Sequence, residues 1–108
     1  MASLYRVALV ETEALTGVKT GSGVSLEPLQ DDFIGYIEVS GNTGNLDCDI
    51  EHSADGVTWL LLKSFTQITV ATGAEAVQIT EHLLPRVRAV VTPSANATVT
   101  VMLYHDKK

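Results

Sequence analysis

The segment 46–62, with the sequence LDCDIEHSADGVTWLLL, constrains the fold of this chain more than any other segment. Its first half alternates apolar with acidic residues, the apolar set being Leu46, Cys48 and Ile50 and the acidic set Asp47, Asp49 and Glu51. Such alternation is typical of a β-strand with one buried and one solvated face. A shift by one residue would bury all the acidic side chains, so the inward face is well defined.

The residues that follow predict a tight turn and a returning strand. The sequence SADG at residues 53–56 suits a type I turn, in which Gly56 takes a left-handed conformation and closes a hairpin with a one-residue bulge. Val57, Trp59 and Leu61 then alternate along the returning strand, and we expect Trp59 and Leu61 to point into the core.

The same period of two recurs along most of the chain. Strands are predicted at 33–40, 46–53, 67–70, 75–80, 86–92 and 97–104, and in a less regular amino-terminal part at 5–10 and 24–29, on either side of a flexible stretch at 19–23. Short strands at regular spacing predict an all-β fold, a two-sheet antiparallel β-sandwich, jelly-roll-like, of about eight strands. The expected core is Ile37, Val39, Cys48, Ile50, Trp59, Leu61, Val77, Ile79, Val87, Ala89, Val99 and Val101.

Length and composition favour one β-sandwich domain, residues 1–108, in which about residues 1–30 form an edge strand or a contact arm. The formal charge of −6 disfavours nucleic acid and anionic membranes as partners, because both are bound through Lys and Arg. The single Cys48 cannot form an internal disulfide. We expect no signal peptide and no transmembrane segment, since every apolar run is short.

No catalytic, cofactor or metal site is predicted. The histidines, His52, His82 and His105, are scattered, and no metalloprotease motif, nucleophile elbow or phosphate-binding glycine loop is present. Successive acidic residues on one strand face lie about 7 Å apart. Calcium gathers its oxygen ligands at about 2.3–2.6 Å from one centre, so we expect the acidic face to be solvated or paired across strands. The chain is therefore expected not to be an enzyme.

The candidate site is a protein interface. Arg86 and Arg88 have the opposite phase to Val87 and Ala89, so both are expected on an outer face. They are expected either to pair with the carboxylates of a neighbouring strand or to face another subunit, for which the planar arginine side chain is well suited. The predicted interface residues are Arg86, Arg88, Asp47, Asp49 and Glu51.

The aromatic residues raise a second possibility, the stacking of a sugar ring. The phase of Trp59 favours the core over an exposed stacking position. Tyr36 and Tyr104 are better candidates for an exposed ring.

Three runs, SADGVTWLLLKSFTQIT, LPRVRAVVT and ATVTVMLY, resemble those of a group of small virion proteins of tailed phages, over roughly residues 37–103. The shared positions are Asp47, Ser53, Asp55, Gly56, Trp59, Phe65, Thr66, Thr69, Arg86, Arg88 and Ala89. The resemblance implies a head decoration or cement role, or another minor structural place in the particle.

From this resemblance we expect a non-enzymatic structural protein that is made in the host cytoplasm and located in the virion. Its expected partners are further copies of itself, as a cyclic homo-oligomer and specifically a trimer, and the major capsid protein or other virion proteins. Two alternatives stay open. One is a carbohydrate-binding or adhesion module that binds glycan through loop residues around Asn42, Asn45, Asp55 and Asn96. The other is a tail or connector subunit.

Overall fold

The computed structural model describes residues 3–26, 33–81 and 83–107 of the chain. Within these ranges no helix is long and apolar enough to cross a membrane. The described ranges contain nine strands: β1 (Ser3–Leu15), β2 (Lys19–Thr20), β3 (Val24–Ser25), β4 (Phe33–Ser40), β5 (Leu46–Ser53), β6 (Leu60–Ser64), β7 (Gly73–Ile79), β8 (Arg86–Pro93) and β9 (Ala97–Lys107).

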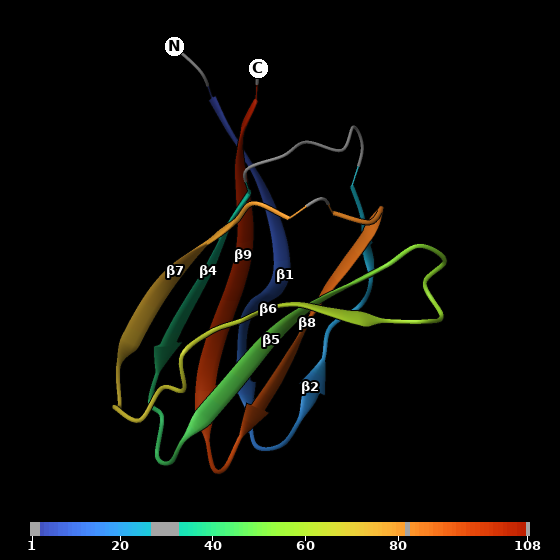
Figure 1. Ribbon diagram of the computed structural model, residues 1–108. Coiled ribbons are helices and arrows are strands. Elements are labelled where there is room, and N and C mark those ends of the chain that lie inside the picture. The colour runs from blue at the N-terminus through green and yellow to red at the C-terminus, as the bar shows by residue number, and fades with distance from the viewer. Residues whose placement is uncertain (1–2, 27–32, 82, 108) are drawn as a thin grey trace.

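The strands form two antiparallel sheets packed face to face (Figure 1). One sheet has the order β1-β9-β4-β7 and the other the order β2-β8-β5-β6, with β3 also paired to β8. Early strands therefore pair with late ones: β1 with β9, β2 and β3 with β8, and β4 with β7, while the hairpin β5–β6 lies innermost. This nested pairing is the jelly-roll arrangement, which confirms the predicted fold class.

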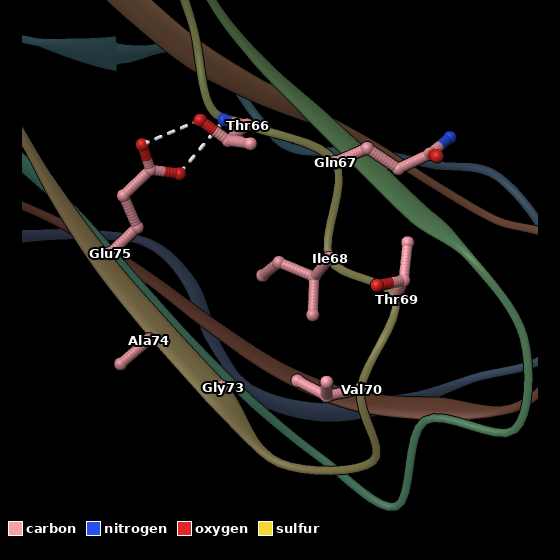
Figure 2. Close-up of a pocket in the computed structure, with 8 residues that line it drawn as sticks. All are labelled: Thr66, Gln67, Ile68, Thr69, Val70, Gly73, Ala74 and Glu75. Carbon is pink, nitrogen blue, oxygen red and sulfur yellow. Dashed lines mark hydrogen bonds between the residues drawn. The ribbon is translucent and has the colours of Figure 1, made fainter.

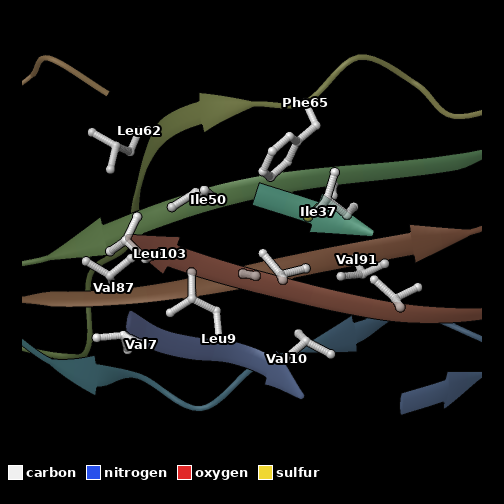
Figure 3. Close-up of a cluster of buried hydrophobic side chains, with 14 of the residues drawn as sticks. Val7, Leu9, Val10, Ile37, Ile50, Leu62, Phe65, Val87, Val91 and Leu103 are labelled. Atoms are coloured by element: carbon white, nitrogen blue, oxygen red, sulfur yellow. The ribbon is translucent and has the colours of Figure 1, made fainter. Parts of the chain in front are cut away.

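The core lies between the inner faces of the two sheets (Figure 3). Along β4 and β5 the period-two alternation has the predicted phase, with Ile37, Val39, Cys48 and Ile50 buried. Burial, together with the nearby charge of Asp49, raises the pKa of the Cys48 thiol to about 12, so this thiol is an uncharged core group.

At one core position, Gly35 of β4, the two sheets approach closely. A Cβ atom at Gly35 would lie only 2.8 Å from Cδ1 of Ile50. Any larger residue would force the sheets apart or displace the side chain of Ile50.

Nine of the twelve predicted core residues are fully buried, and Trp59, Leu61 and Val77 are not. Val77 is half-buried and packs against the core from the edge strand β7. Leu61 is exposed because the register of the β5–β6 pair shifts between Ile50 and Glu51. Leu62 takes the buried position instead.

The predicted strand at 67–70 is wrong. Only Ile68 in this segment forms a bridge, with Leu46, and the segment connects β6 to β7. The expected strand at 24–29 is reduced to β3 in the described part of the chain, since residues 27–29 lie outside it. The stretch expected to be flexible contains β2, and the two short strands β2 and β3 bring the number above eight.

The amino-terminal strand β1 is longer than predicted and irregular. It lies at the edge of its sheet, and its pairing with β9 shifts register between Ala8 and Val10 and again between Val10 and Glu13. Thr12, within the second shift, has a φ of 32°, a conformation that β-branched residues rarely adopt. These β-bulges break the period-two pattern, which explains why the sequence reads as less regular there.

A buried asparagine holds the connection between β6 and β7. The Nδ2 atom of Asn42 donates to the carbonyl oxygens of Ile68, at 3.2 Å, and Val70, at 3.1 Å. Its backbone N–H donates to the carbonyl of Ala71 at 3.0 Å, and its Oδ1 accepts from the N–H of Gly44 at 3.2 Å. The side chain thereby gives the carbonyl of Ile68 a second donor, beside the N–H of Leu46, and gives the carbonyl of Val70 a donor as well.

Replacing Asn42 by Ala should lower the free energy of unfolding by about 1–3 kcal/mol, because the hydrogen bonds of this buried side chain to Ile68, Val70 and Gly44 would be lost. Urea denaturation followed by Trp fluorescence measures this change. The matched control is Asn45→Ala at an exposed position, which should change stability by less than about 0.5 kcal/mol. Equal effects of the two variants would contradict the anchoring role of Asn42.

Candidate functional site

The predicted interface residues lie on the outer face of the central strands β5 and β8. Glu51 is directly opposite Arg88, and the Nε atom of Arg88 lies 2.7 Å from Oε1 of Glu51. Both side chains are 24% exposed, so this ion pair is partly shielded from water. The sequence analysis considered ion pairs between these arginines and carboxylates of a neighbouring strand, and Arg88–Glu51 is such a pair.

The other two carboxylates on this face have separate partners. Asp49 accepts a hydrogen bond from Oγ of Ser64 at 2.7 Å, and Asp47 accepts from Nε2 of Gln67 at 3.2 Å and 3.3 Å. The acidic side chains therefore point toward different neighbours and do not converge. Among the described residues no group of three or more His, Cys, Asp or Glu is placed to hold a metal ion.

Trp59 lies on this outer face and is only half-buried, so its predicted core position is wrong. The guanidinium carbon of Arg88 lies 4.2 Å from the centre of its ring, and the indole Nε1 donates to the carbonyl of Gly56 at 3.2 Å. A Cβ atom at Gly23 would lie 2.9 Å from Cη2 of the ring. Arg88 covers one face of the indole, in a cation–π contact, and does not leave that face free for a sugar.

Arg86 is the first residue of β8 and lies against the β5–β6 turn. Its Nη1 donates to Oγ of Ser25 at 3.3 Å, and a Cβ atom at Gly56 would lie 3.1 Å from its Cδ. Its side chain is exposed. The two arginines therefore share one face, as predicted, but have different neighbours.

The turn that joins β5 to β6 is held by its own side chains. Oγ of Ser53 accepts from the N–H groups of Asp55, at 3.2 Å, and Gly56, at 2.8 Å, and donates to Oδ1 of Asp55. The same Oδ1 accepts from the N–H groups of Thr58 and Val57, and these bonds lower the pKa of the Asp55 carboxyl. Gly56 has a φ of +81°, the left-handed conformation predicted for it. Ser53 is fully buried, although it continues the alternation of the outward-facing Asp49 and Glu51.

The hairpin exposes three large apolar side chains, here called the apolar ridge: Val57, Leu60 and Leu61 are 81%, 53% and 62% exposed. Leu60 and Leu61 are consecutive in β6, so they point to opposite faces of the hairpin. The β5–β6 hairpin extends from the sandwich at the right of Figure 1. The period-two reading missed this surface because it assigned alternate residues of the returning strand to the core. The run of three leucines at 60–62 could have indicated exposed apolar side chains, because a strand turns only alternate residues inward and cannot bury all three.

A groove of about 280 Å³ lies beside the connection between β6 and β7 (Figure 2). Its lining includes Ile68, Val70 and Ala74, and Val70 is 56% exposed. The carboxylate of Glu75 also lines the groove, where it accepts from the N–H of Thr66 at 2.8 Å and from its Oγ1 at 3.0 Å. No sequence pattern indicated this groove, because it depends on the loop path that Asn42 holds.

On the other sheet, the outer face presents a tyrosine pair. Tyr36 and Tyr104 have ring centres 6.4 Å apart at an interplanar angle of 73°, and both are half-buried. The hydroxyl of Tyr36 donates to Oε2 of Glu38 at 3.0 Å, which raises the pKa of Tyr36. The exposed Ile34 extends this partly apolar face.

His52, near the end of β5, is held as a neutral acceptor. Its Nδ1 accepts the N–H of Leu84 at 3.1 Å. Partial burial lowers the pKa of the imidazole below its ordinary value, an effect that the charge of Glu81 opposes in part.

Comparisons with known proteins identify the fold and no family. No family model matches the chain, and no curated protein is similar to it in sequence. Solved structures with the same fold include the SPBc2 prophage-derived protein YomS, with a TM-score of 0.61 and 10% identity over 97% of this chain and 96% of that one. PirA has a TM-score of 0.58 and 18% identity over 94% and 93% of the two chains. The structure of infectious bursal disease virus Gx strain matches with a TM-score of 0.49 and 10% identity, over 96% of this chain and 33% of that one.

The contact of Trp59 with Arg88 should appear as a coupling energy. In a double-mutant cycle with Trp59→Ala and Arg88→Ala, the effects on the free energy of unfolding should fall short of additivity by about 0.5–2 kcal/mol. The control cycle pairs Trp59→Ala with Arg6→Ala, an exposed position on β1 of the other sheet, and should be additive. Additivity in both cycles would refute the contact.

Acidification should destabilise the protein through His52. Because the folded-state pKa lies below the ordinary value of 6.5, the unfolded chain binds the proton first. Stability is therefore lost as pH falls from about 6.5 through the folded pKa. The free energy of unfolding in urea should be lower at pH 5.5 than at pH 7.5, and the difference should shrink in His52→Gln. An unchanged difference in the variant would assign the pH dependence to other groups.

Proposed function

We propose that this chain is a non-enzymatic structural protein of a phage virion, specifically a head decoration or cement protein that binds the shell and strengthens it. The observation that carries this proposal is the apolar ridge on the β5–β6 hairpin. Three large apolar side chains lie exposed within five residues of one projecting element. Exposed apolar patches of this kind are typical of surfaces that contact another protein.

The polar surroundings of the ridge support a role in protein contact. Arg88 is held between the ring of Trp59 and the carboxylate of Glu51, so little side-chain entropy remains for it to lose on binding. Trp and Arg are also the residues that most often dominate binding energy at interfaces.

The fold supports the same role. Jelly-roll sandwiches build many viral capsids, and this chain shares its fold over nearly its whole length with a prophage-derived protein. Folds host many functions, so the proposal depends first on the exposed surface. In this role the chain is located in the virion, and its partners are the major capsid protein and other copies of itself.

A second candidate is a glycan-binding module, favoured by the Tyr36–Tyr104 pair. Aromatic rings that are partly exposed on a sheet face can stack on a pyranose ring, and the hydroxyl of Tyr36 and the carboxylate of Glu38 lie beside them. Trp59 does not belong to this candidate site, because Arg88 covers one face of its ring.

Co-sedimentation with phage heads tests the proposed function. The purified chain should bind tail-free heads that lack their decoration layer, and it should saturate at a fixed, high number of copies per shell subunit. Heads that already carry a full decoration layer are the control and should bind none.

Binding of only a few copies per head would contradict decoration and favour a vertex, connector or tail position. No binding to heads, together with glycan binding that Tyr36→Ala abolishes, would favour the adhesion module.

A further inference from the structure

In the described part of the chain, three of the four sheet edges carry features that discourage the addition of a further strand. At one edge β1 is irregular, with two register shifts along its pairing with β9. On the other sheet, β2 and β3 have only two residues each. At the remaining edge of that sheet β6 contains a register shift, and its Lys63 lies opposite the inward-facing Ile50. Bulges, very short strands and inward-pointing charges are devices by which natural proteins prevent edge-to-edge pairing.

The fourth edge, β7, is regular. Its seven residues pair with β4 from Gly73 to Ile79 without a register shift, and the strand contains neither Lys, Arg nor Pro. Among the described residues β7 pairs with β4 alone, and Figure 1 shows it as the outermost strand of its sheet, at the left. Alternate residues of an edge strand direct their N–H and C=O groups away from the neighbouring strand. The edge of β7 therefore presents backbone groups that can pair with another strand.

The one charged residue of β7 is turned away from this edge. Glu75 has the inward phase of Val77 and Ile79. Its carboxylate accepts from the N–H of Thr66 at 2.8 Å and from the Oγ1 of Thr66 at 3.0 Å, as Figure 2 shows. The charge is therefore satisfied within the chain and does not need a partner outside it.

The side chains of β7 are compatible with a second copy of the same strand. Two identical antiparallel strands are related by a two-fold axis, which we place at the exposed Ala76. In that register Ala76 lies opposite Ala76 of the second copy, Glu75 opposite Val77, and Ala74 opposite Gln78. Like charges directly opposite each other disfavour strand pairing, and no such pair arises here.

The neighbouring strand β4 adds one exposed charge near this edge. Glu38 lies beside Ala74, whose row continues in the second copy with Gln78 and then Ile34. The Glu38 carboxylates of the two copies therefore lie on different rows of the joined sheet. The contact brings no like charges directly opposite each other, although the chain has a net charge of −6.

From the regular, unprotected edge of β7 and the compatibility of its side chains, we infer that β7 of one copy pairs with β7 of a second copy, antiparallel, about a two-fold axis. The inference rests on the proposed role as an assembling structural protein, and it names the surface through which copies meet. Each β7 has one free edge, so the contact closes as a dimer. By itself it does not build the trimer expected from the sequence. The apolar ridge belongs to the other sheet and stays free to contact the shell.

Charge variants at Ala76 test the pairing in the full chain, without phage heads. Sedimentation velocity should show that the mass of the wild type rises toward that of a dimer with concentration. Ala76→Lys and Ala76→Glu should each weaken dimerisation by about 5-fold or more, because like charges would face each other at the axis. An equimolar mixture of the two variants should dimerise again, since Lys would then face Glu. The control is Val18→Lys, at another exposed position, which should dimerise like the wild type.

Cross-linking locates the contact independently. Opposite residues of an antiparallel pair have Cα atoms about 4.5–5.5 Å apart, a separation that a disulfide can span. Under mild oxidation Ala76→Cys should therefore form a covalent dimer, and Val18→Cys should not. The native Cys48 does not interfere, because its thiol is buried.

A wild-type chain that stays monomeric at its highest soluble concentration would overturn the inference. A mixture of the two charge variants that dimerises no better than either variant alone would overturn it as well, because the copies would then not meet at Ala76.

These outcomes are independent of the head-binding experiment. A chain that dimerises through β7 but does not bind phage heads would refute only the proposed function. A chain that decorates heads but is monomeric in solution, and whose Ala76→Lys variant decorates them equally well, would refute only the strand pairing.

Discussion

The antiparallel pairing of β5 with β8 is the constraint on which the rest of this structure depends. Its inner face supplies Cys48, Ile50, Val87 and Ala89 to the core, and each is almost completely buried. Because side chains alternate along a strand, burial of this face determines that the carboxylates and arginines lie outside. The same pairing places the β5–β6 hairpin at one end of the sheet and the Leu46–Ile68 bridge at the other.

The outer face of this pair is organised by a small polar cluster. Glu51 and Trp59 hold the guanidinium of Arg88 from different sides, and Gly23 allows the indole ring to lie close to the backbone between β2 and β3. The cluster links the hairpin to the opposite edge of its sheet. It therefore gives the apolar ridge a defined position, and a rigid surface loses less entropy on binding than a flexible one.

Local irregularities account for most of the differences between the predicted and the observed structure. One register shift in the β5–β6 pair exposes Leu61 and buries Leu62. Two further register shifts in β1 interrupt the period-two alternation, so the sequence predicted a shorter strand than the structure contains. A bulge adds one residue to one strand of a pair, and its position depends on the partner strand, which a single chain segment does not specify.

The sequence by itself determined the all-β class, the inner faces of β4, β5, β8 and β9, the turn at Gly56 and the outward position of the acidic and basic residues. These features follow from the alternation of side chains and from the conformational freedom of glycine, which are local properties. Only the tertiary structure decided that Arg88 covers one face of Trp59, that Leu60 and Leu61 are exposed while Leu62 is buried, and that a groove lies at the far end of β5. Each of these depends on contacts between segments distant in the sequence, such as that of Asn42 with Ile68, and local patterns carry no information about such contacts.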